Sequence, residues 1–144
     1  MKKLLFWVLL LVVAYYGADY VKLHTSGDVV AYKRFAKALL QQNAYIARQA
    51  SSAELAAKAF SRQSERMKPY AGTRLLFSYY VIVRQNLAKD GNKSILVVDQ
   101  VSRVTSNGQT GIWGDREIRT RHTVQVEKKE QSWGVTDFID PAML

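Results

Sequence analysis

The chain of 144 residues contains no cysteine, and this absence excludes several kinds of chemistry. Without cysteine there is no disulfide framework, no thiolate nucleophile, no cysteine-ligated metal site and no cysteine for lipid attachment. Histidine is scarce as well. The two histidines, His24 and His122, are isolated in the sequence, and two isolated histidines do not make a metal site. We therefore expect a protein without metal or cofactor.

Acidic side chains are outnumbered, since 21 Lys and Arg against 12 Asp and Glu give a formal net charge of +9. Without residues 1–26, which we assign below to a membrane segment, eighteen basic and eleven acidic residues remain, a net charge of +7. Such an excess favours anionic lipid headgroups or acidic partners but identifies neither.

The longest uncharged stretch lies at the N-terminus, where two lysines precede the almost wholly apolar run from Leu4 to Ala18. As a helix this run is about 22 Å long, which is short of a hydrocarbon core of about 30 Å. Interfacial tyrosines would extend the span to Leu23, namely Tyr15, Tyr16 and Tyr20. We expect residues 1–26 to be an N-terminal membrane anchor in which residues 4–23 cross the lipid bilayer.

A cleaved signal peptide is the alternative. A cut after Ala18 puts Tyr16 at the third position before the cut, where a small residue is needed, and a cut after Ala14 leaves a short leader. We favour the uncleaved anchor. The two N-terminal lysines then stay in the cytoplasm, so the anchor is a single pass through the inner (cytoplasmic) membrane and residues 27–144 are periplasmic or otherwise extracytoplasmic.

Two helical patterns follow the anchor. From Asp28 to Ala50 apolar residues recur at steps of three and four, which predicts an amphipathic helix. Ser51 followed by Glu54 has the spacing of a capping box, so a second amphipathic helix should start near residue 52. Its apolar stripe stops before Pro69.

Beyond the PYAG break at residues 69–72 the pattern alternates, as is typical of strands. Turn-like segments separate four such stretches, which predicts four antiparallel strands in meander order. The fold class is therefore α+β: two amphipathic helices cover one face of a curved, cone-like antiparallel four-stranded sheet. One domain, residues 27–144, contains both.

The first strand separates its apolar side chains into two rows. One row is Leu75, Phe77, Tyr79, Val81 and Val83, and the other includes Leu76, Tyr80 and Ile82. We expect the aromatic residues of this strand to belong to the core. Trp113 is an exception, because it lies in a glycine-rich loop where an exposed aromatic side chain serves a partner contact.

The last two strands resemble the final hairpin of nuclear-transport-factor-2-like (cystatin-like) domains. Val124 and Val126 alternate before a short polar turn, and Trp133, Val135 and Phe138 precede an Asp-Pro stop. The segment VVDQVSRVTSNG, residues 97–108, extends the resemblance. The chain looks like single-span envelope members of that superfamily, such as Mce-associated membrane proteins and the inner-membrane scaffold component of type IV secretion systems. The resemblance implies a fold with helices on one face of the sheet.

The same superfamily includes enzymes with a pocket between helices and sheet, and this resemblance defines an alternative function. His122 would point into such a pocket as acid or base, with Asp99, Asp137 and Tyr79 as neighbours. The chain would then be a small-molecule-binding or isomerase- or hydrolase-like protein. Against this stands the simpler interpretation of His122 as a packing residue in the alternating row of its strand.

We favour a non-enzymatic, membrane-tethered domain that mediates protein contacts in an envelope secretion or transport assembly. Its partners would be other envelope proteins or further copies of the chain. The candidate contact residues are Trp113, Arg116, Arg119 and Arg121, the arginines being expected on one strand face. Nucleic acid is an unfavoured partner, because the aromatic residues fall in apolar rows rather than among the basic ones.

Overall fold

The structure is a computed structural model and describes residues 2–68, 72–106, 114 and 116–139. In this part of the chain four helices precede four strands. Their bounds are α1 Lys2–Thr25, α2 Gly27–Leu40, α3 Ala44–Ala50, α4 Ala53–Met67, β1 Thr73–Leu87, β2 Lys93–Ser106, β3 Arg116–Lys129 and β4 Ser132–Ile139.

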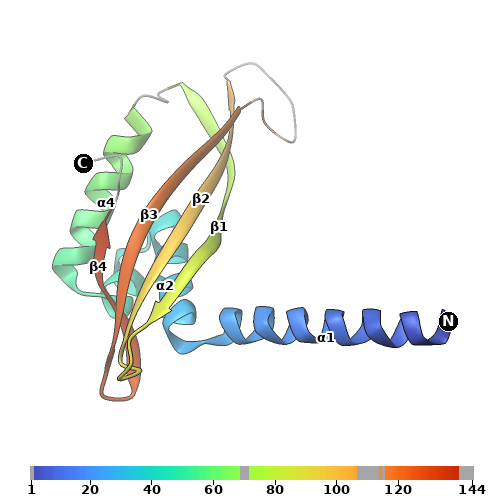
Figure 1. Ribbon diagram of the computed structural model, residues 1–144. Helices are drawn as coiled ribbons and strands as arrows, with labels where there is room; N and C mark the ends of the chain where they lie inside the picture. Colours follow the sequence, from blue (N-terminus) through green and yellow to red (C-terminus); the bar gives the residue numbers. More distant parts are fainter. Residues whose placement is uncertain (1, 69–71, 107–113, 115, 140–144) are drawn as a thin grey trace.

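Helix α1 projects away from the rest of the chain (Figure 1). Its segment Leu4–Thr25 has a mean hydropathy of 1.9, is long and apolar enough to cross a membrane, and is not buried against the rest of the protein. An isolated helix with such a surface is unstable in water, because nothing removes its apolar side chains from the solvent. The fold thus contains an apolar N-terminal helix that suits a single-pass membrane anchor.

The remaining elements form the predicted α+β domain. The four strands pair antiparallel in the order β1-β2-β3-β4. They are long and curved, and α2, α3 and α4 lie on one face of the sheet (Figure 1). We call this covered face the inner face, and the opposite one the outer face. The predicted fold class is therefore confirmed.

The core lies between the helices and the inner face. Its largest fully buried side chains, Tyr32 and Phe35, come from α2, and small alanines of all three covering helices allow the helices to approach the sheet closely. From the strands the core receives Leu96, Val98, Val124, Val126, Val135 and Phe138. Val135 and Phe138 are three residues apart and would face opposite sides of a regular strand. The register shift opposite Gln125 and Val126 brings both to the inner face.

The predicted helix from Asp28 to Ala50 is wrong in one respect, because the structure breaks it into α2 and α3. Gln42 has a left-handed backbone with φ of 53°, which no continuous helix accommodates. The Asn43 side chain then accepts a hydrogen bond from the N–H of Ile46 and caps α3. Three helices, rather than two, therefore cover the sheet.

The predicted start of the last helix is shifted by one residue. The N-cap of α4 is Ser52, whose Oγ accepts a hydrogen bond from the N–H of Leu55 at 3.1 Å. The Ser51 hydroxyl instead donates to the carbonyl of Ala47 and closes α3. Two adjacent serines thus serve two different helices, and the spacing to Glu54 does not distinguish between them.

Candidate functional site

The inner face is closed, and His122 is part of its packing. The His122 Nε2 and the Tyr32 hydroxyl are 2.8 Å apart. The imidazole also packs against the ring of Phe138, and the two ring centroids are 4.8 Å apart. The cavity at this point has a volume of about 10 Å³. Ligand pockets for small molecules have volumes of about 300–1,000 Å³. At this point the interior has room for a single water molecule, and none for a substrate.

The residues proposed to assist His122 lie elsewhere. Asp99 pairs with Arg121 and Val81 in the sheet, and Asp137 pairs with Gln125, so both carboxylates are on the outer face. Tyr79 is on the outer face as well, opposite Val101. The structure therefore places His122 on one side of the sheet and all three candidate neighbours on the other.

A ladder of paired charges crosses the outer face from β2 to β3. Arg121 donates two hydrogen bonds to Asp99, from Nε at 2.7 Å and from Nη2 at 3.0 Å. Glu117 forms two ion pairs, one with Arg103 at 2.6 Å and one with Arg119 at 3.3 Å. We call these five residues the arginine ladder. Arg103 was not predicted from the sequence, because it lies on β2 and its pairing with Glu117 depends on the strand register.

The ladder presents its positive groups outward. The side chains of Arg119 and Arg121 are 60% and 59% exposed, whereas that of Asp99 is 8% exposed. The hydrogen bond from Arg121 holds the pKa of Asp99 below its ordinary value, against an opposing effect of burial, and the charge of Arg121 adds to the lowering. The carboxylate thus stays ionised beneath the guanidinium and keeps it in position.

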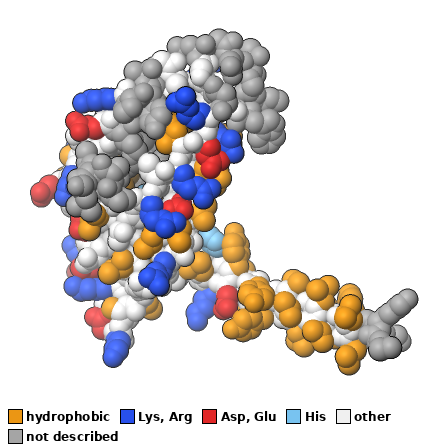
Figure 2. Space-filling view, turned by 45° about the horizontal axis from the view of Figure 1, so that its top comes forward, with side chains coloured by type: hydrophobic (Ala, Val, Ile, Leu, Met, Phe, Trp, Pro, Cys, Tyr) orange, Lys and Arg blue, Asp and Glu red, His pale blue; other side chains and the backbone are white. Residues whose placement is uncertain are grey.

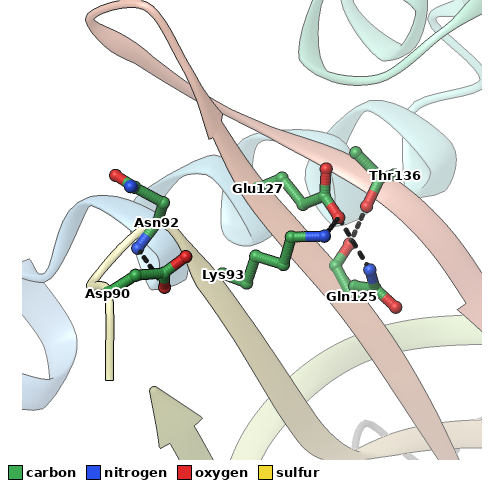
Figure 3. Close-up of polar contacts among 6 residues, drawn as sticks. All are labelled: Asp90, Asn92, Lys93, Gln125, Glu127 and Thr136. Atoms are coloured by element: carbon green, nitrogen blue, oxygen red, sulfur yellow. Dashed lines mark hydrogen bonds and ion pairs between the residues drawn. The ribbon is translucent and has the colours of Figure 1, made fainter. Parts of the chain in front are cut away.

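A second polar group closes the hairpin end of the same strands (Figure 3). Lys93 forms an ion pair of 3.1 Å with Glu127, and Gln125 donates to the same carboxylate at 2.8 Å. These hydrogen bonds, first that of Lys93, lower the pKa of Glu127. Lys93 and Glu127 are also directly opposite each other in the sheet, so their ion pair supports the observed register of β2 and β3.

Two of the predicted contact residues are not part of the ladder. Arg116 pairs with Val104, one position along from the pair of Arg103 and Glu117, so it lies on the opposite face of β3. The expectation that all three arginines share a face is therefore wrong for Arg116. Trp113 lies outside the described residues.

A row of apolar side chains on β1 borders the ladder. Phe77, Tyr79, Val81 and Val83 are each between 40% and 48% exposed, and we call them the outer row. Leu75, which was expected in the same row, lies beyond a register shift and pairs with Val104 on the other face. The expectation that Phe77 and Tyr79 belong to the core is wrong, because the helices cover the other row of β1. Tyr80 of that row is partly buried and packs against the core. Figure 2 shows basic and apolar side chains next to one another on one face of the domain.

The junction of α1 and α2 contains a buried carboxylate that the sequence analysis missed. Asp28 is 2% exposed, and its Oδ2 accepts a hydrogen bond of 2.7 Å from Nε2 of Gln85 on β1. Burial alone would raise the pKa of Asp28, but the polar side chains of Ser94, Gln85 and Ser26 and a backbone N–H around the carboxylate outweigh it and lower the pKa. An acidic residue directly after a glycine at a helix start was the available signal.

Comparison with known proteins adds little to this geometry. No protein-family profile matches the chain, and no curated protein matches its sequence. A structural similarity exists to the intermembrane space region of the chloroplast protein ARC6, with 9% sequence identity and a TM-score of 0.40 over 76% of this chain and 90% of that one. So weak a similarity supports no conclusion about function.

Proposed function

We propose that the chain is a membrane-tethered extracytoplasmic domain that binds other proteins of the envelope through the arginine ladder, within a secretion or transport assembly. The preordered ladder carries this proposal. An exposed arginine loses side-chain conformational entropy when it binds a partner. An arginine that an acidic side chain already holds in place loses less, so binding costs less free energy. Arginine is also enriched among the residues that dominate protein interfaces.

Two further observations support the same function. The apolar α1 suits a single-pass anchor, which would keep the domain at one membrane surface. The interior around His122 is filled, so the observation that would favour the pocket alternative, an open cavity with a carboxylate beside the imidazole, is missing from the described residues. Membership of the nuclear-transport-factor-2-like superfamily is part of the proposal. It is supported by three helices on one face of a four-stranded antiparallel sheet.

The ladder suggests the chemistry of the partner. Outward guanidinium groups bind carboxylates with two parallel hydrogen bonds, so an acidic surface or segment of another envelope protein fits them best. Orientation follows from the N-terminal lysines, which favour a cytoplasmic N-terminus and an extracytoplasmic domain.

Site-specific photocrosslinking in intact cells tests the proposed function. A crosslinking residue at Thr123, which follows the ladder on the outer side of β3, should form a defined adduct with another envelope protein. Arg119→Glu should weaken the adduct about tenfold or more, while Arg119→Lys should retain part of it, because charge remains but the planar fork is lost.

Lys58→Glu on exposed α4 is the matched charge reversal and should leave the adduct unchanged. The unfolding midpoint of each variant shows whether the domain is intact. An adduct that survives Arg119→Glu, or that Lys58→Glu weakens equally, would contradict the ladder as the binding surface.

A further inference from the structure

The anchor enters the domain with almost no linker. Helix α1 ends at Thr25 and α2 begins at Gly27, so Ser26 alone separates them. The N–H of Ser26 donates to the carbonyl of Lys22 at 3.1 Å, and the N–H of Val30 donates to the carbonyl of Ser26 at 2.9 Å. A helix that crosses a bilayer therefore holds this domain directly at the headgroup layer, without a segment long enough to let it stand away.

Side-chain contacts hold the junction against β1. The Gln85 Nε2 donates to Asp28 Oδ2 at 2.7 Å and to Ser26 Oγ at 3.3 Å. Ser26 in turn donates from Oγ to the carbonyl of Leu23 at 2.8 Å. Figure 1 shows α1 leaving the domain on the side where β1 forms the edge of the sheet, opposite to α4. The strand that faces the membrane side is consequently β1.

The outer row on this strand has the composition of a membrane-interface surface. Between Arg74 and Arg84 the sequence LLFSYYVIV contains no charge, and the rings of Phe77 and Tyr79 stack with centroids 6.3 Å apart. Aromatic and aliphatic side chains prefer the boundary between headgroups and acyl chains. The two exposed arginines at the ends of the row are placed to meet lipid phosphates.

A groove lies on the other side of the same edge strand, at the foot of the anchor, because Gln85 pairs with Leu96 of the inner face. It has a volume of about 410 Å³ and is lined by Asp19, Lys22, Leu23, Ser26, Gln85 and Leu87. The groove lies where α1 reaches the end of its apolar span, which is the depth of the headgroups. Lys22 suits a phosphate, although Asp19 adds a carboxylate to the same lining, and the two leucines suit the upper part of an acyl chain.

From these observations we infer that the β1 edge of the sheet, with the outer row on one side and the groove at the foot of α1 on the other, lies on the phospholipid headgroups of the bilayer that α1 crosses. The domain is thus held to the membrane by the edge of its sheet as well as by its anchor. The arginine ladder lies on β2 and β3, which are one and two strands away from β1. Since β3 is about 10 Å from β1, the ladder stays available to a protein partner.

Single-cysteine labelling tests this inference in the full chain, because the protein has no cysteine of its own. An environment-sensitive fluorophore is attached to Tyr79→Cys or Val81→Cys, and to Lys58→Cys on exposed α4 as the control. Each labelled protein is reconstituted into phosphatidylcholine vesicles with and without phosphatidylglycerol, and lipids with brominated acyl chains serve as quenchers. Quenching at residues 79 and 81 should exceed that at residue 58 about threefold or more.

A further variant links the signal to the outer row. Phe77→Ser should reduce quenching of the label at residue 81 and leave that at residue 58 unchanged, with an unaltered unfolding midpoint in detergent, since Phe77 is outside the core. Equal, water-like emission at all three positions would overturn the inference. The inference would also be overturned if the label at residue 79 were shielded from water, were not quenched by brominated lipid, and changed with the protein-to-lipid ratio. That result would mean that a second copy of the chain covers the outer row. The quenching result does not depend on the crosslinking experiment, so failure to form the protein adduct would contradict the proposed function without contradicting this inference.

Discussion

At the scale of single residues, the buried polar groups of this protein connect elements that are distant in the sequence. Asp28 connects the start of α2 to Gln85 on β1, and the Tyr32 hydroxyl connects α2 to His122 on β3. A buried polar group that is hydrogen-bonded contributes modestly to stability, but breaking the bond leaves its partner desolvated at a cost of about 1–3 kcal/mol. Both groups should therefore act on stability.

Asp28 should make the stability of the domain depend on acid. Its folded-state pKa is lowered, so its charge stabilises the fold fully above the ordinary carboxyl pKa of about 3.9, and this contribution is lost as the pH falls through the folded value. Asp28→Asn should lower the urea midpoint of the full chain in detergent at pH 7. The difference from the parent should shrink below about pH 4. Glu54→Gln, at an exposed carboxylate of α4, is the matched amide variant and should change the urea midpoint at pH 7 much less.

His122 and Tyr32 should be coupled in stability. Tyr32→Phe removes the hydroxyl and should cost about 0.5–1.5 kcal/mol, and His122→Gln should cost about 1–3 kcal/mol. The double variant should cost less than the sum, since both changes remove the same contact. Denaturant unfolding measures all three. A strictly additive result would mean that the 2.8 Å contact does not stabilise the fold.

His122→Gln also separates the two functional alternatives. We expect the crosslinked adduct at Thr123 to form as well in this variant as in the parent, because His122 lies on the inner face and the ladder on the outer one. An adduct lost at unchanged stability would favour the pocket alternative instead.

At the scale of elements, the turn between α2 and α3 decides how the helices cover the sheet. It bends the chain after Leu40 through one left-handed residue and restarts the helix with a side-chain cap. The alternating rows of β1 show the same dependence on context. Their separation into two faces follows from the strand period, but which face is covered depends on where the helices pack.

Two neighbouring substitutions in this turn should have opposite signs. Gln42→Gly relieves a left-handed backbone and should raise the free energy of unfolding by up to about 1 kcal/mol. Asn43→Ala removes the cap to Ile46 and should lower it by about 1 kcal/mol. Denaturant titration of the two variants beside the parent measures both. Destabilisation by Gln42→Gly would mean that the predicted relief of strain is outweighed.

At the scale of the whole molecule, an exposed apolar helix is joined to a folded domain through one residue, which suits a domain that works at a membrane surface. The net positive charge of the part after the anchor adds an attraction to anionic headgroups. The anchor and the two proposed surfaces would give the domain a defined orientation, with β1 towards the lipid and the ladder of β2 and β3 towards a partner.

The anchor itself should depend on the apolar character of its middle. The full-length protein should stay with membranes after alkaline carbonate washing and keep its full mass. Val12→Arg places a charge at the centre of the span at a cost of about 2.5–3.5 kcal/mol and should increase release, whereas Tyr20→Arg at its end should not. A shortened mature form that begins near Tyr15 or Asp19 would contradict the anchor.

Sequence periodicity by itself determined the class of fold, the four antiparallel strands, the apolar N-terminal helix and the inner position of His122. These features follow from local patterns of period 3.6 and 2, and from the length of an apolar run. Tertiary structure alone decided that Asp99 lies under Arg121, that Arg103 joins the ladder, that Phe77 and Tyr79 are exposed and that Asp28 meets Gln85. Each of these depends on strand register or on the packing of elements distant in the chain, and no local pattern of residues contains that information.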